Sequence, residues 1–406
     1  MNCRHCEKPL RYTFVDLGFA APSNAYLSKD DLNCQEIYYP LKIKVCEKCW
    51  LVQTEDSADP ASFFTPDYAY FSSTSTSFLL HAKNFSNKII KELDLNKDSY
   101  VVEVASNDGY LLKNFLEANI PCLGIEPTKS TAEVAERLNI PVVRKFFGES
   151  LVEQLVNEGK HADLIIGNNV YAHVPDINDF TKGLKNLLKP GGTITLEFPH
   201  LMNLIEQAQF DTIYHEHFSY LSLHTVSRIF SSFGLRIWDV EKLSTHGGSL
   251  RIYGCHEIDK RKTKKTVKIL LDEEKNCKLQ ELDTYQKFQL KIDRIKNEFV
   301  SFLINQKRSG KKVVAYGAAA KGNTLLNYAG IRPDLIKVVY DASRSKQDRF
   351  LPGSHIPIQN PKNMKDLNPD CVIILPWNIE EEIKNKIFTY LSKDILIKSI
   401  KDFKFL

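Results

Sequence analysis

Four cysteines near the N-terminus have the residue type and the spacing of a metal site. Cys3-x-x-Cys6 is followed, after 39 intervening residues, by Cys46-x-x-Cys49. Two CxxC knuckles can supply four thiolates in a tetrahedron, the donor set of a closed structural zinc site. We therefore predict a structural Zn²⁺ bound by these four cysteines, a redox pair being the alternative. The other five cysteines are scattered and are interpreted as small buried side chains.

A second pattern, at residues 103–126, has the layout of a nucleotide site. A turn of small and acidic residues, 103–109, follows a buried strand pattern, and Glu126 ends the next strand pattern. Such a turn lets a ligand approach the backbone, and an acid at Glu126 can bind both hydroxyls of a ribose. The turn lacks the glycines of a dinucleotide fingerprint, and its acids suit a sulfonium and repel phosphates. This favours S-adenosylmethionine, with a dinucleotide or a merely structural turn as alternatives.

Two more polar stretches follow later strand patterns. Asn168, Asn169 and His173 come after the strand expected at 163–167, and Tyr214-His-Glu-His-Phe-Ser-Tyr comes after the strand expected at 193–198. The carboxyl ends of parallel strands meet at one edge of a sheet, so both stretches should border the same crevice. Two histidines around a carboxylate can form a general base with an orienting partner. Surface polar residues without a chemical role are the alternative.

These stretches are positioned by an α/β pattern. Short apolar strands alternating with helices predict a parallel sheet covered on both faces. The strands are expected at 100–104, 122–126, 163–167 and 193–198, with a closing antiparallel hairpin near 234–240 and 248–254. A strand at 39–45 precedes them and a helix at 78–93 leads into them. One long helix at 266–308 then leads to a second α/β unit with strands at 312–317, 336–340 and 371–375.

Composition limits the class of protein. The chain has 406 residues, 43% of them hydrophobic and 26% charged, and a formal net charge of +4. The small charge gives no reason to expect a nucleic acid or an anionic membrane as partner, and the basic run at 256–265 is interpreted as a solvated linker. The sequence contains no run of about 18 apolar residues, so we do not expect a membrane span. The first residues lack the apolar segment of a signal peptide, so we expect a cytoplasmic protein.

The chain resembles a known family, the three-domain, zinc-containing C-methyltransferases of deoxysugar biosynthesis, which act on nucleotide-linked 4-keto sugars. The resemblance spans nearly the whole chain and is carried by the double CxxC, FFTPDYAYFSSTS, VVEVASNDGYLL, GIEP, GNNVYAHVPD, FDTIYHEHFSYLS and YGAAAKGNTLLN. It implies a zinc-binding module at 1–58, a central Rossmann-like class I methyltransferase domain at 59–262, and a C-terminal Rossmann-like α/β domain at 263–406. One departure from methyltransferases in general is Ala105, where a glycine is usual.

The resemblance also implies a reaction. A ketone at C-4 of the sugar acidifies the hydrogen at C-3, a base removes it, and the enolate carbon attacks the methyl group of S-adenosylmethionine. His217 looks like the base, alone or together with Tyr214, and Glu216 would orient or tune this pair. Tyr68 would close over the sugar, and His173 would contact the sugar or the enolate oxygen. The residues expected to hold the cofactor are Glu103, Ala105, Ser106, Asn107, Asp108, Gly109, Glu126, Pro127, Asn168 and Asn169.

The C-terminal unit is then expected to hold the nucleotide. Lys321 and Asn323, after a turn at Gly317, suit a diphosphate at a helix N-terminus. Further donors and acceptors are expected at the end of the next strand, although a solvated loop is the alternative; they are Asp341, Arg344 and Lys346. The expected partner is a nucleotide-linked keto-deoxysugar, and a monomer is expected. Competing functions are an RNA methyltransferase, a dinucleotide-dependent oxidoreductase and a non-catalytic sugar-nucleotide binding protein.

Overall fold

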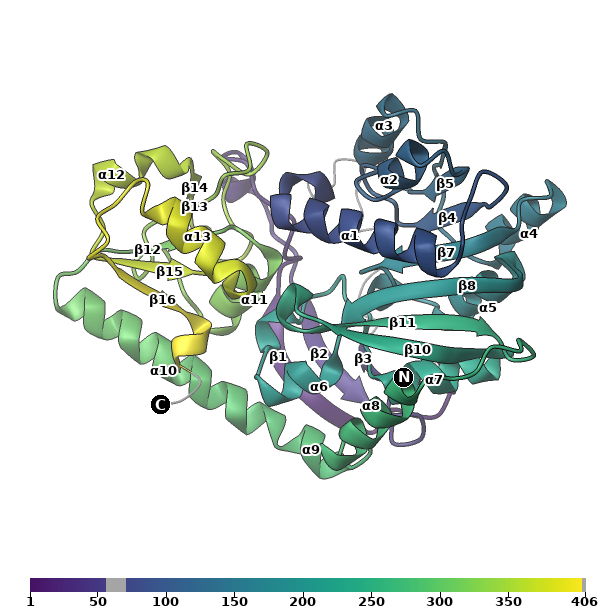
Figure 1. Ribbon diagram of the computed structural model, residues 1–406. Coiled ribbons are helices and arrows are strands. Elements are labelled where there is room, and N and C mark those ends of the chain that lie inside the picture. Colours follow the sequence, from purple (N-terminus) through teal and green to yellow (C-terminus); the bar gives the residue numbers. More distant parts are fainter. Residues whose placement is uncertain (56–70, 404–406) are drawn as a thin grey trace.

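The computed structural model describes residues 1–55 and 71–403. These residues form three β-sheets with helices packed around them (Figure 1). Within the described ranges, every helix is too short or too polar to span a bilayer.

An antiparallel sheet carries the N-terminal cysteines. Its strands, in spatial order, are β1 (Tyr12–Ala20), β2 (Tyr39–Val45), β3 (Val52–Thr54) and β9 (Ser219–Tyr220). In β2 the apolar Leu41, Ile43 and Val45 are buried and alternate with more exposed lysines, which is the pattern of a half-buried strand. Strand β9 belongs to the histidine-containing loop at 214–220, so this loop pairs directly with the cysteine-bearing sheet.

The central sheet has seven strands in the described residues. Their spatial order is β10 (Leu235–Leu243), β11 (Ser249–His256), β8 (Leu188–Pro199), β7 (Ala162–Asn168), β4 (Val101–Val104), β5 (Cys122–Ile125) and β6 (Val142–Val143). Strands β8 to β6 are parallel, whereas β11 runs antiparallel to both β8 and β10. The four predicted strands and the predicted hairpin are thus confirmed, and the carboxyl ends of β4, β5, β7 and β8 share one edge.

Helices cover both faces of this sheet (Figure 1). They are α1 (Thr76–Glu92), α2 (Leu112–Glu117), α3 (Lys129–Arg137), α4 (Glu149–Asn157), α5 (Ile177–Leu187) and α7 (Leu223–Ser232), whereas α6 (Leu201–Glu206) packs in the core of the N-terminal sheet. Successive residues of a strand enter different apolar cores: Leu164 and Ile166 pack with α1 and α2, and Ile165 packs with α5 and α7. This two-sided burial explains why the strands are continuously apolar.

The long helix predicted at 266–308 is wrong as a single element. It is three helices, α8 (Lys265–Asn276), α9 (Leu282–Gln286) and α10 (Phe288–Arg308). The first break lies at Lys278, which has the left-handed φ of 59° and so cannot continue an α-helix. The Tyr285 hydroxyl donates a hydrogen bond of 2.6 Å to the Leu279 carbonyl and holds the connecting turn in place.

A parallel five-stranded sheet forms the C-terminal unit. Its spatial order is β14 (Ile358–Gln359), β13 (Val339–Tyr340), β12 (Val313–Tyr316), β15 (Cys371–Ile374) and β16 (Leu396–Ser399). Its helices are α11 (Ala320–Tyr328), α12 (Met364–Leu367) and α13 (Glu380–Ile387). The strand predicted at 336–340 is only two residues long, whereas those at 312–317 and 371–375 lie where predicted.

The N-terminal sheet and the C-terminal unit share one apolar core. The Phe14 ring of β1 stacks on the Phe288 ring of α10 with centroids 4.6 Å apart. Tyr26, beyond β1, donates a hydrogen bond of 2.6 Å to the Ala318 carbonyl after β12. The N-terminal sheet and the C-terminal unit therefore pack together beside the central sheet. The domain boundaries predicted at residues 58 and 262 stay a proposal.

Candidate functional site

The four predicted metal ligands lie together. The sulfur atoms of Cys3, Cys6, Cys46 and Cys49 all lie within 4.8 Å of one another. Three of the side chains are buried and that of Cys6 is half-buried. The Gln53 side-chain amide donates a hydrogen bond of 3.2 Å to the Cys3 sulfur, the kind of support that orients a metal-bound thiolate. A cluster of four thiols makes this a closed site that fits structural zinc.

The turn after β4 has an unusual backbone. Ala105, Asn107 and Gly109 have positive φ angles of 58°, 49° and 77°. Ala105 therefore occupies a conformation that glycine adopts without strain and alanine does not. At Gly109 an added Cβ would lie 2.5 Å from a methyl group of Ile140, so a side chain there would displace α3 or the residues after it. The turn consequently brings its backbone close to the sheet edge.

Glu103, at the end of β4, carries a buried carboxylate without a partner. The residue is 1% exposed, and neither carboxylate oxygen has a hydrogen bond to any residue that the structure describes. Burial raises the pKa of Glu103 well above its usual value, and the nearby charges of Asp108 and Glu126 raise it further. Such an orphaned acid in a native structure indicates a missing cation or donor. The arrangement fits a positively charged ligand.

The two other acids are partly satisfied by the backbone. Asp108 accepts a 3.0 Å hydrogen bond from the Ser73 N–H through Oδ2, while its Oδ1 has none. Glu126 accepts hydrogen bonds of 3.0 Å from the Asn107 N–H and 2.9 Å from the Thr128 N–H. These bonds fix the Glu126 carboxylate at the carboxyl end of β5, each oxygen keeping a second lone pair for a hydroxyl.

The other residues predicted to hold the cofactor lie at the same edge. Asn169 has a φ of 54°, and its N–H donates a 2.7 Å hydrogen bond to the Glu197 carbonyl. The side-chain oxygens of Asn168, Asn169 and Ser106 are buried and have no hydrogen-bond partner within residues 1–55 and 71–403. Pro127 follows Glu126 directly. The structure thus gathers the predicted set around one sheet edge with polar atoms still to be satisfied.

His217 is the centre of an aromatic cluster. Its ring centroid lies 4.0 Å from that of Tyr214 and 4.6 Å from that of His173. Its Nδ1 lies 2.9 Å from the Thr212 carbonyl oxygen, so Nδ1 carries the proton and Nε2 the lone pair. Burial lowers the pKa of His217 well below 6.5, and the nearby His173 imidazole and Lys321 charge disfavour its protonation further. The ring is therefore a neutral imidazole with Nε2 as its basic atom.

The role predicted for Glu216, to orient or tune the pair of His217 and Tyr214, stays a prediction. Its carboxylate accepts a 2.6 Å hydrogen bond from the Asn24 side chain, which belongs to the N-terminal segment. The group that orients the His217 ring is the Thr212 carbonyl. The hydrogen bond joins the His217 ring to a main-chain carbonyl five residues earlier. A main-chain partner of this kind leaves no signature in the pattern of side chains.

His173 ends the 3₁₀ turn Tyr171–His173 that follows β7. Burial lowers the pKa of His173 to about 4, although a hydrogen bond to the Glu216 backbone opposes the shift. A second neutral imidazole therefore lies beside His217. Tyr68 lies outside the described residues, and its role stays a prediction.

Lys321 enters the same site from the C-terminal unit. It lies in the first turn of α11, after β12 and the Gly317 turn. Its ammonium lies 2.9 Å from the Asn378 side-chain oxygen and 4.9 Å from the Trp377 ring centroid. Burial lowers the pKa of Lys321 to about 8. The charge of Lys321 contributes to the lowered pKa of His217.

Asn323 was predicted to contact substrate, and this role stays a prediction. The residue is 0% exposed. Its amide donates a 3.4 Å hydrogen bond to the Ser23 carbonyl, and its side-chain oxygen accepts one of 3.2 Å from Asn327. The side chain joins α11 to the N-terminal segment. The sequence alone does not show this packing.

The three residues predicted to bind the nucleotide after β13 differ in their contacts. The Asp341 carboxylate accepts 2.7 Å hydrogen bonds from the N–H groups of Ala318 and Ser343. The Lys346 ammonium donates a 2.8 Å hydrogen bond to the Ala318 carbonyl. Both side chains thus shape the loop after β12, while Arg344 is exposed. That Asp341, Arg344 and Lys346 contact the nucleotide stays a prediction.

A buried ion cluster beside the site was missed by the sequence reasoning. Glu197, in β8, pairs with Arg251 at 2.5 Å and with His81 of α1 at 2.9 Å, and it accepts a 2.8 Å hydrogen bond from the Thr245 hydroxyl. Despite its burial, these partners lower the pKa of Glu197 to about 2. The available signal was an acid inside an otherwise apolar strand pattern.

His246 is not among the predicted site residues. It has a φ of 53°, precedes two glycines, and places its ring edge-on to Phe78 with centroids 6.0 Å apart. An added Cβ on Gly247 would lie 2.4 Å from the Trp377 ring, so the glycine permits contact with the C-terminal unit. Burial and the charge of Lys321 lower the pKa of His246 to about 4. The signal was a histidine before Gly-Gly at the start of β11.

Family models cover most of the chain. A zinc binding domain matches residues 3–64, a methyltransferase domain matches residues 79–240, and a C-methyltransferase C-terminal domain matches residues 244–396. These models support the fold described above: a zinc module with four cysteine ligands, a class I methyltransferase fold and a C-terminal parallel α/β sheet.

One relative matches almost end to end. The C-methyltransferase NovU of Streptomyces niveus is 31% identical over 382 residues, which is 94% of this chain and 91% of that protein. Among solved structures, Synechocystis magnesium protoporphyrin IX methyltransferase with bound S-adenosylmethionine has a TM-score of 0.35 at 14% identity, covering 50% of this chain and 99% of that one. The PH0226 protein of Pyrococcus horikoshii has a TM-score of 0.37 at 14% identity, covering 49% and 100%. The chain belongs to the zinc-binding, S-adenosylmethionine-dependent C-methyltransferase family.

Proposed function

We propose that the enzyme methylates a ring carbon, C-3 being favoured, of a nucleotide-linked 4-keto-6-deoxy sugar through an enolate. The observation that carries this proposal is the buried imidazole of His217, whose Nδ1 lies 2.9 Å from the Thr212 carbonyl oxygen and whose ring contacts those of Tyr214 and His173. A carbon acid needs a base before it can react, and an imidazole poised in its neutral form supplies one.

Each side of the site has a task in this proposal. S-adenosylmethionine supplies an electrophilic methyl group on a sulfonium. Glu103, Asp108 and Glu126 hold its amino and ribose groups at the ends of β4 and β5. His217 takes the proton through Nε2, with Tyr214 beside it, and His173 faces the oxygen on which negative charge develops. Lys321 holds the diphosphate of the sugar nucleotide.

Glu103→Gln is expected to weaken binding of S-adenosylmethionine. A hydrogen bond to a charged group contributes about 1.5–3 kcal/mol, so the dissociation constant should rise about 10–100-fold. Isothermal titration calorimetry measures this directly, with Glu117→Gln, on the exposed side of α2, as the control. Affinity in the unchanged enzyme should also weaken as pH falls through the raised pKa of Glu103, and the variant should lack this dependence. Unaltered affinity would remove Glu103 from the cofactor site.

Lys321→Ala is expected to raise KM for the sugar nucleotide more than it lowers kcat. Loss of one charged hydrogen bond predicts about a 10–100-fold rise in KM. Lysine is charged below its pKa, so kcat/KM of the unchanged enzyme should fall as pH rises through about 8, and the variant should lose this alkaline limb. Lys311→Ala, which changes an exposed lysine before β12, is the control. An unchanged KM would contradict the assignment.

The function itself is tested by incubating the enzyme with S-adenosylmethionine and a panel of nucleotide-linked 4-keto-6-deoxyhexoses. Mass spectrometry should find a sugar nucleotide that gains one methylene mass, and NMR should place the new methyl group on the carbon next to the ketone. If no sugar in the panel is methylated although S-adenosylmethionine binds, the acceptor is of another class.

A further inference from the structure

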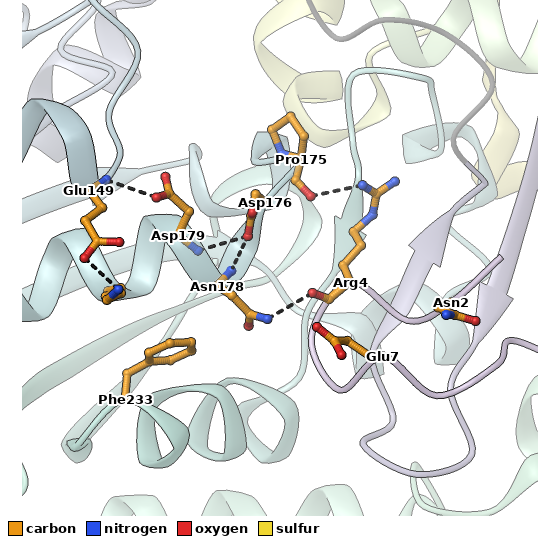
Figure 2. Close-up of a pocket in the computed structure, with 10 residues that line it drawn as sticks. Asn2, Arg4, Glu7, Glu149, Pro175, Asp176, Asn178, Asp179 and Phe233 are labelled. Atoms are coloured by element: carbon orange, nitrogen blue, oxygen red, sulfur yellow. Dashed lines mark hydrogen bonds and ion pairs between the residues drawn. The ribbon is translucent and has the colours of Figure 1, made fainter.

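The first cysteine knuckle is fastened to the methyltransferase domain. A groove of about 550 Å³ lies where residues 2–7 meet α4 and α5. Figure 2 shows the Asn178 amide directed at the Arg4 backbone and the Arg4 guanidinium directed at Pro175. Asn178 donates hydrogen bonds of 3.2 Å to the Arg4 carbonyl and 3.0 Å to the His5 carbonyl. The knuckle therefore has a fixed place on the domain.

The Arg4 side chain contacts three separate segments. It donates hydrogen bonds of 3.0 Å to the Pro175 carbonyl and 3.2 Å to the Thr54 carbonyl, and its guanidinium lies 5.0 Å from the Phe218 ring centroid. A guanidinium is planar and has five donors, so it can serve two carbonyls and an aromatic face at once. Arg4 is thus shared by the cysteine-bearing sheet and two loops of the methyltransferase domain.

Both of these loops carry a histidine of the site. Pro175 follows His173 by two residues, and Phe218 directly follows His217. The loops are also joined to each other, because the Phe218 N–H donates a 2.8 Å hydrogen bond to the Ala172 carbonyl. Arg4 lies at the junction where the two loops and β3 meet.

The metal knuckle fixes Arg4 in turn. Arg4 is flanked by the ligand positions Cys3 and Cys6, and its N–H donates a 2.8 Å hydrogen bond to the Gln53 side chain. The same Gln53 amide donates to the Cys3 sulfur. Hydrogen bonds therefore connect the knuckle, Gln53 and Arg4, and the Arg4 guanidinium contacts the two loops that carry His173 and His217.

We propose that Arg4 is a positioning residue through which the zinc knuckle sets the relative position of His173 and His217. The proposal rests on the role proposed above for His217. It gives the metal a task in the reaction that is distinct from holding its own module together. A misplacement of about 1 Å in a reacting group can cost about 10²-fold in rate, so a device that aligns two loops has a large effect on kcat.

The test compares Arg4→Met, which keeps much of the side-chain length, with Arg11→Met, an exposed arginine before β1. Arg4→Met should lower kcat about 10–100-fold, with KM, zinc content and affinity for S-adenosylmethionine unchanged. Hydrogen-exchange mass spectrometry, which needs no turnover, should show faster exchange at 171–178 and 212–220 but not at 103–109. Arg4→Lys, which keeps the charge and some donors, should recover part of kcat.

Two results would overturn the proposal. One is unchanged exchange at both loops together with an unchanged kcat. The other is loss of zinc or faster exchange throughout the chain, which would make Arg4 a general structural residue. A second variant, Asn178→Ala, loosens the knuckle without changing Arg4 and should give the same local exchange pattern. Failure of the proposed function is recognised separately, because His217→Asn would then keep its turnover while the exchange result for Arg4→Met stands.

Discussion

His217→Asn is expected to lower kcat by about 10²–10⁴-fold, the usual contribution of a general base. Asparagine is similar in size and can keep the hydrogen bond to the Thr212 carbonyl, but it has no basic nitrogen at the Nε2 position. His217 is bonded to the Thr212 carbonyl and, in the described residues, has no hydrogen bond to Glu103, Asp108 or Glu126, so affinity for S-adenosylmethionine should not change. Steady-state kinetics with the sugar nucleotide, together with calorimetry for the cofactor, separates the two effects.

The pH dependence gives a second check on His217. A histidine acts as a base only when neutral, and burial keeps the pKa of His217 well below 6.5. The turnover of the unchanged enzyme should therefore stay constant as pH falls through 6.5 and decline only in more acidic solution. His161→Asn, a partly exposed histidine before β7, is the control and should have unchanged turnover. A loss of less than about threefold for His217→Asn, far below the range for base catalysis, would refute the assignment.

Cys49→Ser is expected to release the zinc and to unfold the N-terminal module. Binding of structural zinc contributes about 10–16 kcal/mol in small zinc-dependent domains, and three of the four ligands do not form a closed tetrahedral site. The module also supplies β3, which pairs with β9 of the histidine loop, so activity should be lost together with the metal. Metal analysis, limited proteolysis and the kinetic assay should change together.

Cys34→Ser is the matched control for this substitution. Cys34 belongs to the same module, is exposed, and lies outside the four-cysteine cluster. Its replacement should leave zinc content, protease resistance and activity as they are. A Cys49→Ser protein that keeps a full equivalent of zinc, or a Cys34→Ser protein that loses it, would contradict the ligand set.

Local patterns made much of the fold predictable. The strands of both parallel sheets are short apolar runs, and their burial on two faces follows directly from that composition. The cysteine pairs were predictable because metal chemistry demands a fixed donor type at fixed spacing. The break at Lys278 was not predictable, because the apolar pattern continues across it and the backbone turns there to satisfy a buried tyrosine hydroxyl.

The site was harder to predict than the fold. The sequence placed the acids of the cofactor edge and His217 because they follow strand ends, which topology brings together. It could not assign the orientation of His217 to the Thr212 carbonyl, since every residue has a carbonyl group. It could not show the contact between Asn323 and Ser23, because packing between segments 300 residues apart leaves no local signal. No role in the site was predicted for His246 and Arg4 for the same reason, since their neighbours come from distant parts of the chain.

The most direct test of the account is proton exchange at the sugar carbon in heavy water, followed by NMR. The unchanged enzyme, given a nucleotide-linked 4-keto-6-deoxyhexose that it methylates and S-adenosylhomocysteine in place of the methyl donor, should exchange the hydrogen next to the ketone for deuterium. His217→Asn should lose this exchange in parallel with its turnover. If methylation proceeds in the unchanged enzyme without any exchange above the uncatalysed rate, or if His217→Asn exchanges as fast as the unchanged enzyme, base abstraction by His217 is contradicted.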